Sequence, residues 1–195
     1  MRPSVFDFID NLDTLLAVII GAVLATGGAM VAELVQDRLG RKRKARDAAR
    51  FFGEILTSVD RVLDRAISSL KYGDRFGSVS KRLFRTASEE TSVYERNRER
   101  MFDIHDIELR RLIHTHFLEE TVPLVAMLEY WDEVDTVEKE LAEDDEMSEA
   151  RRAAKLNELE QLKDRREVAL QSVVEQRKQT KLICDLLEPI ADLKF

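Results

Sequence analysis

Residues 15–32 read LLAVIIGAVLATGGAMVA, eighteen consecutive positions without a charged side chain. As an α-helix this stretch would extend about 27 Å, close to the thickness of the hydrocarbon core of a bilayer. A buried core helix would be expected to show a polar face, but Thr26 is the one clearly polar side chain here. A cleaved signal peptide would begin with a basic segment, whereas residues 1–13 contain one arginine and three aspartates. The stretch therefore predicts a single transmembrane helix.

The charges that flank this stretch predict its orientation. Cytoplasmic flanks of membrane helices are enriched in lysine and arginine, and on the N-terminal side only Arg2 is basic. We therefore expect the N-terminus outside the cell (inner) membrane and the remaining chain in the cytoplasm. The same basic run can lie on anionic lipid headgroups. The basic residues on the C-terminal side are Arg38, Arg41, Lys42, Arg43, Lys44, Arg46 and Arg50.

Small residues recur on the predicted membrane helix and make part of its surface smooth. Such surfaces allow a second helix to approach closely, because membrane helices associate through packing rather than through the hydrophobic effect. We expect this surface to contact another membrane helix, either from a second copy of the chain or from a different protein. Its residues are Ala17, Gly21, Ala25, Gly28, Ala29 and Ala32.

The remaining chain has the composition of a helical protein. Charged residues make up 35% of the sequence, while there are only seven glycines and three prolines, the main helix interrupters. The net charge of −7 argues against a general nucleic-acid-binding protein, which needs a basic surface. We expect four parts: an interfacial segment at 1–12, the transmembrane helix at 13–36, a basic juxtamembrane segment at 37–50, and a cytoplasmic helical bundle at 51–195. Whether the membrane helix continues past Gly40, a natural point for a bend, stays open.

Apolar side chains repeat at three- and four-residue steps through the bundle region, which predicts an all-α antiparallel bundle of four or five helices. A loop is expected at 71–78 and a second helix from near Thr86 or Ser88, because Thr86-x-x-Glu89 and Ser92-x-x-Glu95 both fit the capping-box pattern. Asp103 is a candidate cap for the next helix, and Pro123 predicts a break or kink at Thr121. The acidic stretch 143–148 predicts a turn. A last long helix is expected from its cap at Ser148 to about Leu187, with Pro189 ending it and its partner helix completing a long hairpin.

Chemistry-bearing residues are sparse. His105 and Glu108 are placed one turn apart on the expected helix, yet His114 and His116 do not complete a metal site with them, so we expect surface or interface histidines. The acidic run from Glu138 to Glu149 lacks the order and the central glycine of an EF-hand and predicts a solvated turn. Cys184 has no neighbouring histidine and is expected to be a buried small apolar residue. Arg166 and Arg177 interrupt the apolar positions of the last helix, either to set register or to face a partner, unless the helical phase is assigned imprecisely.

No catalytic motif, metal site or cofactor-binding motif is found in the sequence, which favours a non-enzymatic protein. We expect a membrane-anchored helical interaction protein that acts as a scaffold or accessory subunit of a membrane assembly. A homo-oligomeric membrane effector or pore gated by the bundle is the alternative, and a transmembrane signalling module is a weaker one. A pore would need a polar stripe through the bilayer, and Thr26 with the flanking Asp13 and Glu33 supplies little of one.

Overall fold

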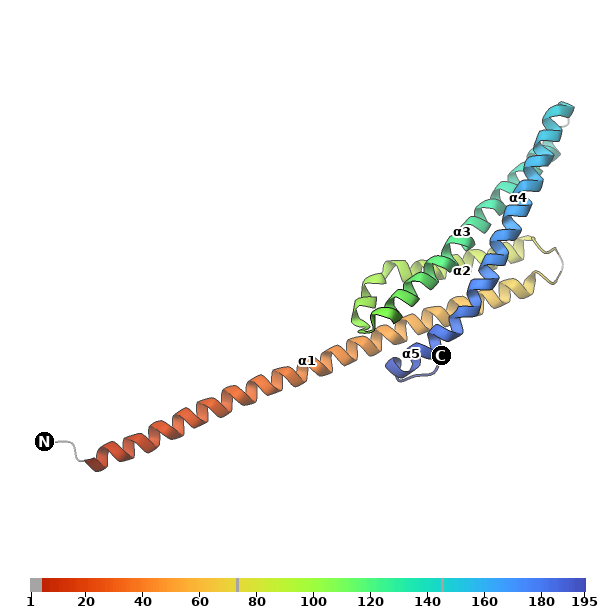
Figure 1. Cartoon of the computed structure of the whole chain (residues 1–195). Helices are drawn as coiled ribbons and strands as arrows, with labels where there is room; N and C mark the ends of the chain where they lie inside the picture. The colour runs from red at the N-terminus through yellow and green to blue at the C-terminus, as the bar shows by residue number, and fades with distance from the viewer. Residues whose placement is uncertain (1–4, 73, 145) are drawn as a thin grey trace. The chain divides into compact units, whose positions relative to one another are not determined.

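The computed structural model describes the backbone of residues 5–72, 74–144 and 146–195, and side chains from Thr14 onward. Across these residues the chain is all-α, with no strand, as the sequence predicts. It divides into two compact units, Met1–Lys44 and Ala45–Phe195, which we describe separately. The elements in chain order are α1 (Val5–Ser69), α2 (Ser78–Arg96), the 3₁₀ helix η1 (Arg98–Asp103), α3 (Ile107–Glu143), α4 (Glu149–Gln176), the 3₁₀ helix η2 (Arg177–Gln179) and α5 (Thr180–Ala191) (Figure 1).

The helix α1 begins in the first unit and ends in the second, and it is unbroken at Gly40. Its residues between 45 and 69 supply one side of the bundle core through positions spaced by three and four residues. Each fully buried large aliphatic or aromatic side chain stabilises the fold by about 1.5–3 kcal/mol. The buried residues of this half are Ala45, Ala48, Ala49, Phe52, Ile55, Leu56, Val59, Leu63 and Ala66.

The helix α2 begins at Ser78, which makes the predicted start near Thr86 or Ser88 wrong. The hydroxyl groups expected to cap a new helix instead donate to carbonyl oxygens one turn back: Thr86 to Arg82 at 3.1 Å and Ser92 to Glu89 at 2.6 Å. Hydroxyls inside a helix commonly form such bonds, so the capping-box pattern occurred here without a helix start. Burial of Phe84 and Tyr94 in the core holds α2 in place.

The helix α3 corrects two predictions. Its N-cap is Asp106, whose carboxylate accepts hydrogen bonds from the amides of Glu108 at 2.9 Å and Leu109 at 3.0 Å, while Asp103 belongs to η1. The expected break at Thr121 is also wrong, because α3 continues through Pro123. An interior proline costs about 3 kcal/mol, which burial of the apolar face of α3 offsets. The buried residues around the proline are Phe117, Leu124, Met127, Leu128 and Trp131.

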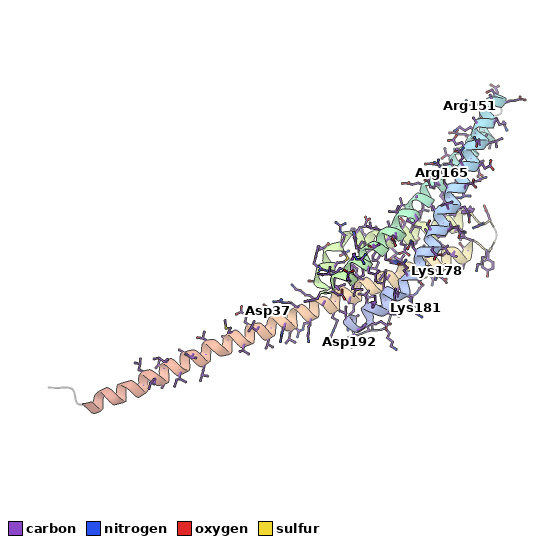
Figure 2. All side chains as sticks on the ribbon, viewed as in Figure 1. Asp37, Arg151, Arg165, Lys178, Lys181 and Asp192 are labelled. Carbon is purple, nitrogen blue, oxygen red and sulfur yellow. The ribbon has the colours of Figure 1, made fainter. Side chains whose placement is uncertain are left out.

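The long hairpin predicted near the C-terminus is formed by α3 and α4, which run side by side in Figure 1. Ser148 caps α4 as predicted, accepting from the amide of Arg151 at 3.4 Å. Val134, Val137 and Leu162 form a separate small core inside the hairpin. The side chains of Arg151 and Arg165 in α4 point outward (Figure 2).

The last helix is shorter than the sequence indicates. α4 ends at Gln176, the chain continues as η2, and α5 then runs to Ala191 with Pro189 inside it. Pro189 therefore does not end the helix. The end comes at Asp192, a non-glycine residue in the left-handed conformation with φ of 54°. Just beyond it the ring of Phe195 packs on Gly53, where an added Cβ would lie 2.0 Å from the ring.

Candidate functional site

The small residues predicted to pack in the membrane lie in the first unit and all are exposed. A Cβ added at Gly21 or Gly28 would meet no atom within 4 Å, so both glycines border open space. This part of α1 is the one described helix that is long and apolar enough to cross a membrane by length and composition. None of its apolar window is buried within the chain. The exposed small residues are Ala17, Gly21, Ala25, Gly28, Ala29 and Ala32.

The polar side chain inside this stretch is satisfied by the helix itself. The Thr26 hydroxyl donates to the carbonyl oxygen of Ala22 at 2.8 Å, so it needs no further partner in an apolar environment. Glu33 follows the stretch and is exposed. The side chain of Asp13 lies outside the described residues. Within the described part of the stretch, no side chain supplies a continuous polar path.

The predicted basic run divides between the two units. Arg38, Arg41, Lys42, Arg43 and Lys44 are exposed in the first unit, where Arg41 lies 3.7 Å from Asp37 on the next turn. Arg46 belongs to the second unit and lies 3.9 Å from Asp192.

Arg50 departs from the rest of the basic run. It is half-buried and donates from Nε to the Ala191 carbonyl oxygen at 2.8 Å. Because a cation at the C-terminus of a helix stabilises the free carbonyl groups there, Arg50 has a structural role in attaching α5 to α1.

Of the three histidines, His105 is exposed, as the sequence predicts, while His114 is half-buried and His116 is buried. His105 lies outside α3, so it does not share a helical face with Glu108 or His116. His114 is half-buried, and its Nδ1 lies 2.6 Å from the hydroxyl oxygen of Tyr94. Burial raises the pKa of Tyr94 to about 12, so the phenol stays protonated. In the described residues, no three histidine, cysteine or carboxylate side chains are placed to hold a metal ion.

His116 is fully buried, and the sequence reasoning missed this. Its Nε2 lies 3.2 Å from the Thr180 hydroxyl and 3.6 Å from a carboxylate oxygen of Glu120, which is buried too. His116 Nδ1 and both Glu120 oxygens have no hydrogen-bond partner among the described protein atoms. The helical spacing in the sequence could have predicted this burial, because positions 113, 116, 120 and 124 of α3 follow one another at steps of three and four residues and share one face.

Burial shifts the pKa of both members of this pair. Loss of hydration lowers the pKa of His116 from 6.5 to about 4, although the nearby Asp60 acts in the opposite direction. Burial, reinforced by Asp60, raises the pKa of Glu120 from 4.5 to about 7, with Arg177 opposing. The direction is the same for both groups: each favours its neutral form.

Arg177 connects the α4–α5 junction to α1 through ion pairs. Its Nε donates to Asp60 at 2.6 Å, and a terminal nitrogen lies 2.9 Å from Asp64. The hydrogen bond and charge of Asp60 raise the pKa of Arg177, so this arginine is charged. Arg177, which interrupts the apolar positions in the sequence, thus forms ion pairs within the chain.

A groove of 540 Å³ opens beside this junction. Figure 2 labels Lys178 and Lys181 at this place, and both line the groove with Asp60, Cys184 and Phe195. Cys184 is buried, as predicted, and burial raises the pKa of its thiol, which makes it a poor nucleophile at neutral pH. Both acidic and basic side chains line the groove, and the described lining contains no nucleophile activated by a base.

Arg166 is buried and stacks on aromatic rings. Its guanidinium carbon lies 3.6 Å from the centre of the Phe76 ring and 5.4 Å from that of Trp131. Trp131 Nε1 in turn donates to the Phe76 carbonyl oxygen at 3.1 Å. Arg166 therefore connects α4 to the segment between α1 and α2, and both the buried Arg166 and the half-buried Arg177 make their contacts within the fold.

The acidic run from Glu138 to Glu149 contains the predicted turn, because α3 extends to Glu143 and α4 begins at Glu149, while Glu138 and Glu140 are helical. Several of its carboxylates pair with cations of α4: Glu140 with Lys155 at 3.1 Å and Glu138 with Lys163 at 2.6 Å. These pairs join the two arms of the hairpin and are exposed, so each contributes less than about 1 kcal/mol.

The comparisons with known proteins return nothing: no protein-family model, no curated protein and no solved structure matches this chain.

Proposed function

We propose that this chain is a single-pass membrane-anchored interaction protein that serves as a scaffold or accessory subunit of a membrane assembly. One observation carries the proposal: the apolar window of α1 is not buried anywhere within the chain. Exposed apolar side chains on a helix in water would cost about 25 cal/mol for each Å² of surface, so a bilayer or a partner must cover them. Because the window has the length of a membrane span, the bilayer is the natural cover.

The basic residues after the window support an orientation with the second unit in the cytoplasm. Arg38, Arg41, Lys42, Arg43 and Lys44 follow the window within twelve residues, and they are exposed. Positive residues at such positions are retained on the cytoplasmic side. Arg50 no longer counts toward this charge bias, because it is engaged with α5. Five exposed cations in the first unit are still enough to direct the orientation.

The second unit supports an interaction role over catalysis. The side chains with the most perturbed pKa values, His116 and Glu120, are sealed in the core, where a substrate has no access. The long α3–α4 hairpin instead offers a large charged surface of the kind that scaffold proteins present to partners. A pore is less well supported, because Thr26 already satisfies its hydroxyl within the helix.

Membrane fractionation tests the anchor. The full chain should remain in the pellet after alkaline carbonate extraction of its native membranes, and a protease added outside intact cells should spare the region after Lys44. Release of the chain by carbonate would disprove the anchor, and cleavage from outside would disprove the orientation.

The mass of the complex purified in mild detergent tests the assembly role. Stoichiometric co-purification with a different membrane protein is the expected result. A complex of this chain alone, with more than two copies, would favour the homo-oligomeric effector instead.

A further inference from the structure

The polar groups beneath the start of α5 are incompletely paired. His116 and Glu120 of α3 are buried, and His116 Nδ1 and both carboxyl oxygens of Glu120 have no hydrogen-bond partner among the described protein atoms. Thr180, the first residue of α5, covers this pair and places its hydroxyl 3.2 Å from His116 Nε2. A buried polar group without a partner costs free energy that is recovered when water reaches it. Movement of α5 away from the pair would therefore recover part of this cost.

The backbone that joins α4 to α5 has the form of a hinge. α4 ends at Gln176, and three residues of 3₁₀ helix, η2, follow before α5 begins at Thr180. The hydrogen-bond geometry of a 3₁₀ segment is poorer than that of an α-helix, and such a segment between helical stretches often marks a hinge. The side-chain oxygen of Gln176 is also buried without a partner among the described atoms. A rotation at η2 would carry α5 as one unit.

The chain encloses α5 less completely than it encloses α3. The groove of about 540 Å³ lies between α5 and α1 and is lined by Thr57 on one side and Cys184 on the other. The outer side of α5 is exposed at Leu182 and Leu186. The backbone of α5 lies close to α3 over a short stretch, whereas α3 and α4 lie together over a long one (Figure 1). Local opening costs least in segments with few neighbours.

Polar contacts hold both ends of α5 to α1. Next to its start, Arg177 Nε donates to Asp60 at 2.6 Å, and at its end Arg50 donates to the carbonyl oxygen of Ala191 at 2.8 Å. Both contacts are only partly buried, so water can compete for them. Between these two ends the apolar side chain of Ile183 packs into the core.

We propose that α5 is a lid on the second unit, which opens about η2 while the rest of the unit stays folded. Opening separates Thr180 from His116, breaks the ion pairs of Arg177 and lets water reach the His116–Glu120 pair. It also uncovers the apolar side of α5 and the surface on which this side packs. The movement needs neither a bilayer nor a partner, so it goes beyond the proposed anchor and can fail without affecting it.

Native-state hydrogen exchange of the full chain in detergent tests the lid. The backbone amides of α5 and α3 are followed with residue resolution at increasing urea concentrations below the unfolding transition. After correction for intrinsic rates, the amides near Leu187 should exchange at least about ten-fold faster than those near Leu124 in α3. Their exchange should also depend less on urea, because opening of α5 exposes less surface than unfolding of the whole unit.

Two substitutions in η2 separate the lid from the bundle. Arg177→Gln removes the ion pairs with Asp60 and Asp64 and should raise the exchange rate of the α5 amides about five-fold, while α3 is unchanged. Lys178→Gln is the matched control, because it removes the same charge from the next residue. Lys178 pairs with Glu175 of α4 and not with α1, so the exchange of α5 should be unchanged.

Three results would overturn the lid. Equal opening free energies and equal urea dependences for α5 and α3 would show that α5 opens only with the whole unit. Exchange rates that rise steadily along α5 toward Ala191 would show fraying of a helix end. An equal loss of protection in α3 with Arg177→Gln would show that this arginine supports the whole bundle. The natural chain alone decides the first two results, whether or not Arg177→Gln folds.

Discussion

The two halves of α1 belong to one helix, but only the second half buries its apolar residues within the chain. Between residues 45 and 69, positions such as Phe52 and Leu56 are completely buried by other parts of the same chain. Between residues 14 and 39, Leu24 and Val31 are 69% and 61% exposed. Apolar character alone therefore does not say what covers a helix. The second half has a polar face, whereas residues 15–32 have almost none and are long and apolar enough to cross a membrane.

The largest effect should come from the core of the second unit. Trp131→Ala removes a fully buried ring, its hydrogen bond to the Phe76 carbonyl oxygen and the surface on which Arg166 stacks. The free energy of unfolding of the bundle should fall by at least about 3–5 kcal/mol, measured by chemical denaturation. Leu24→Ala in the first unit should leave the same transition unchanged. An equal effect of both changes would contradict the division into two units.

The apolar half of α1 should instead respond to charge. Leu24→Arg places a cation in the middle of the window, which costs about 2.5–3.5 kcal/mol on an insertion scale. Because the glycines and alanines of the window contribute little to insertion, most of the chain should move to the carbonate-soluble fraction. Leu156→Arg, at an exposed leucine of the α3–α4 hairpin, is the matched control and should leave fractionation unchanged. Retention of Leu24→Arg in the membrane would argue for a protein rather than a lipid cover.

His116 and Glu120, the buried pair in α3, should each make the free energy of unfolding depend on pH, and the two dependences should have opposite signs. The pKa of Glu120 is raised in the folded protein, so its contribution to stability is complete below pH 4.5 and is lost as the pH rises through about 7. The pKa of His116 is lowered, so its contribution is complete above pH 6.5 and is lost as the pH falls through about 4. In the natural protein the two dependences offset each other between about pH 4.5 and 6.5.

Two variants test this compensation, with urea denaturation across the pH range as the measurement. Glu120→Gln should lose stability as the pH falls from 6.5 toward 4, and His116→Gln should gain stability as the pH falls from 7 toward 4.5. Each change should reach a magnitude on the order of 3 kcal/mol. Glu119→Gln, at the exposed neighbour, should follow the natural protein. Identical slopes for both variants would show that the pair is not neutral in the folded state.

The smallest effects should come from two glycines of α1. Gly40→Ala meets no atom within 4 Å and should stabilise the helix by up to about 1 kcal/mol. Gly53→Ala places its Cβ 2.0 Å from the Phe195 ring, so the ring must move out and the gain in helix propensity is offset. A fluorescent or NMR label at Phe195 should report greater exposure with Gly53→Ala and no change with Gly40→Ala. An undisturbed Phe195 in Gly53→Ala would show that the ring does not rest on α1.

Much of the helical architecture followed from local patterns. The 3.6-residue periodicity, the scarcity of glycine and proline and the cap at Ser148 predicted the all-α class and the C-terminal hairpin, and the structure confirms these. The predicted helix boundaries were wrong where the same residue pattern is compatible with both the end and the interior of a helix. Thr86 and Ser92 have the pattern of caps but bond back to their own helix, and Pro123 is placed where core packing outweighs the lost hydrogen bond.

In the candidate site too, only features that depend on neighbouring residues in the sequence could be predicted. The small residues and the basic run were visible in the sequence, because exposure at a surface needs no partner from elsewhere in the chain. The roles of Arg50 and Arg177 were not visible, since their partners Ala191 and Asp60 are more than a hundred residues away in the sequence. His116 and Glu120 could have been placed in the core by register, but not beside Thr180.

The sequence by itself determined the uncharged window of membrane length, its basic flank and the helical character of the rest, because each depends on the order of neighbouring residues along one helix. Only the tertiary structure decided which apolar half of α1 is covered by the chain, which arginines are engaged inside it, and which carboxyl group has a raised pKa. The physical reason is that burial and ion pairing depend on residues from several helices meeting in space, and periodicity along one helix carries no information about that meeting.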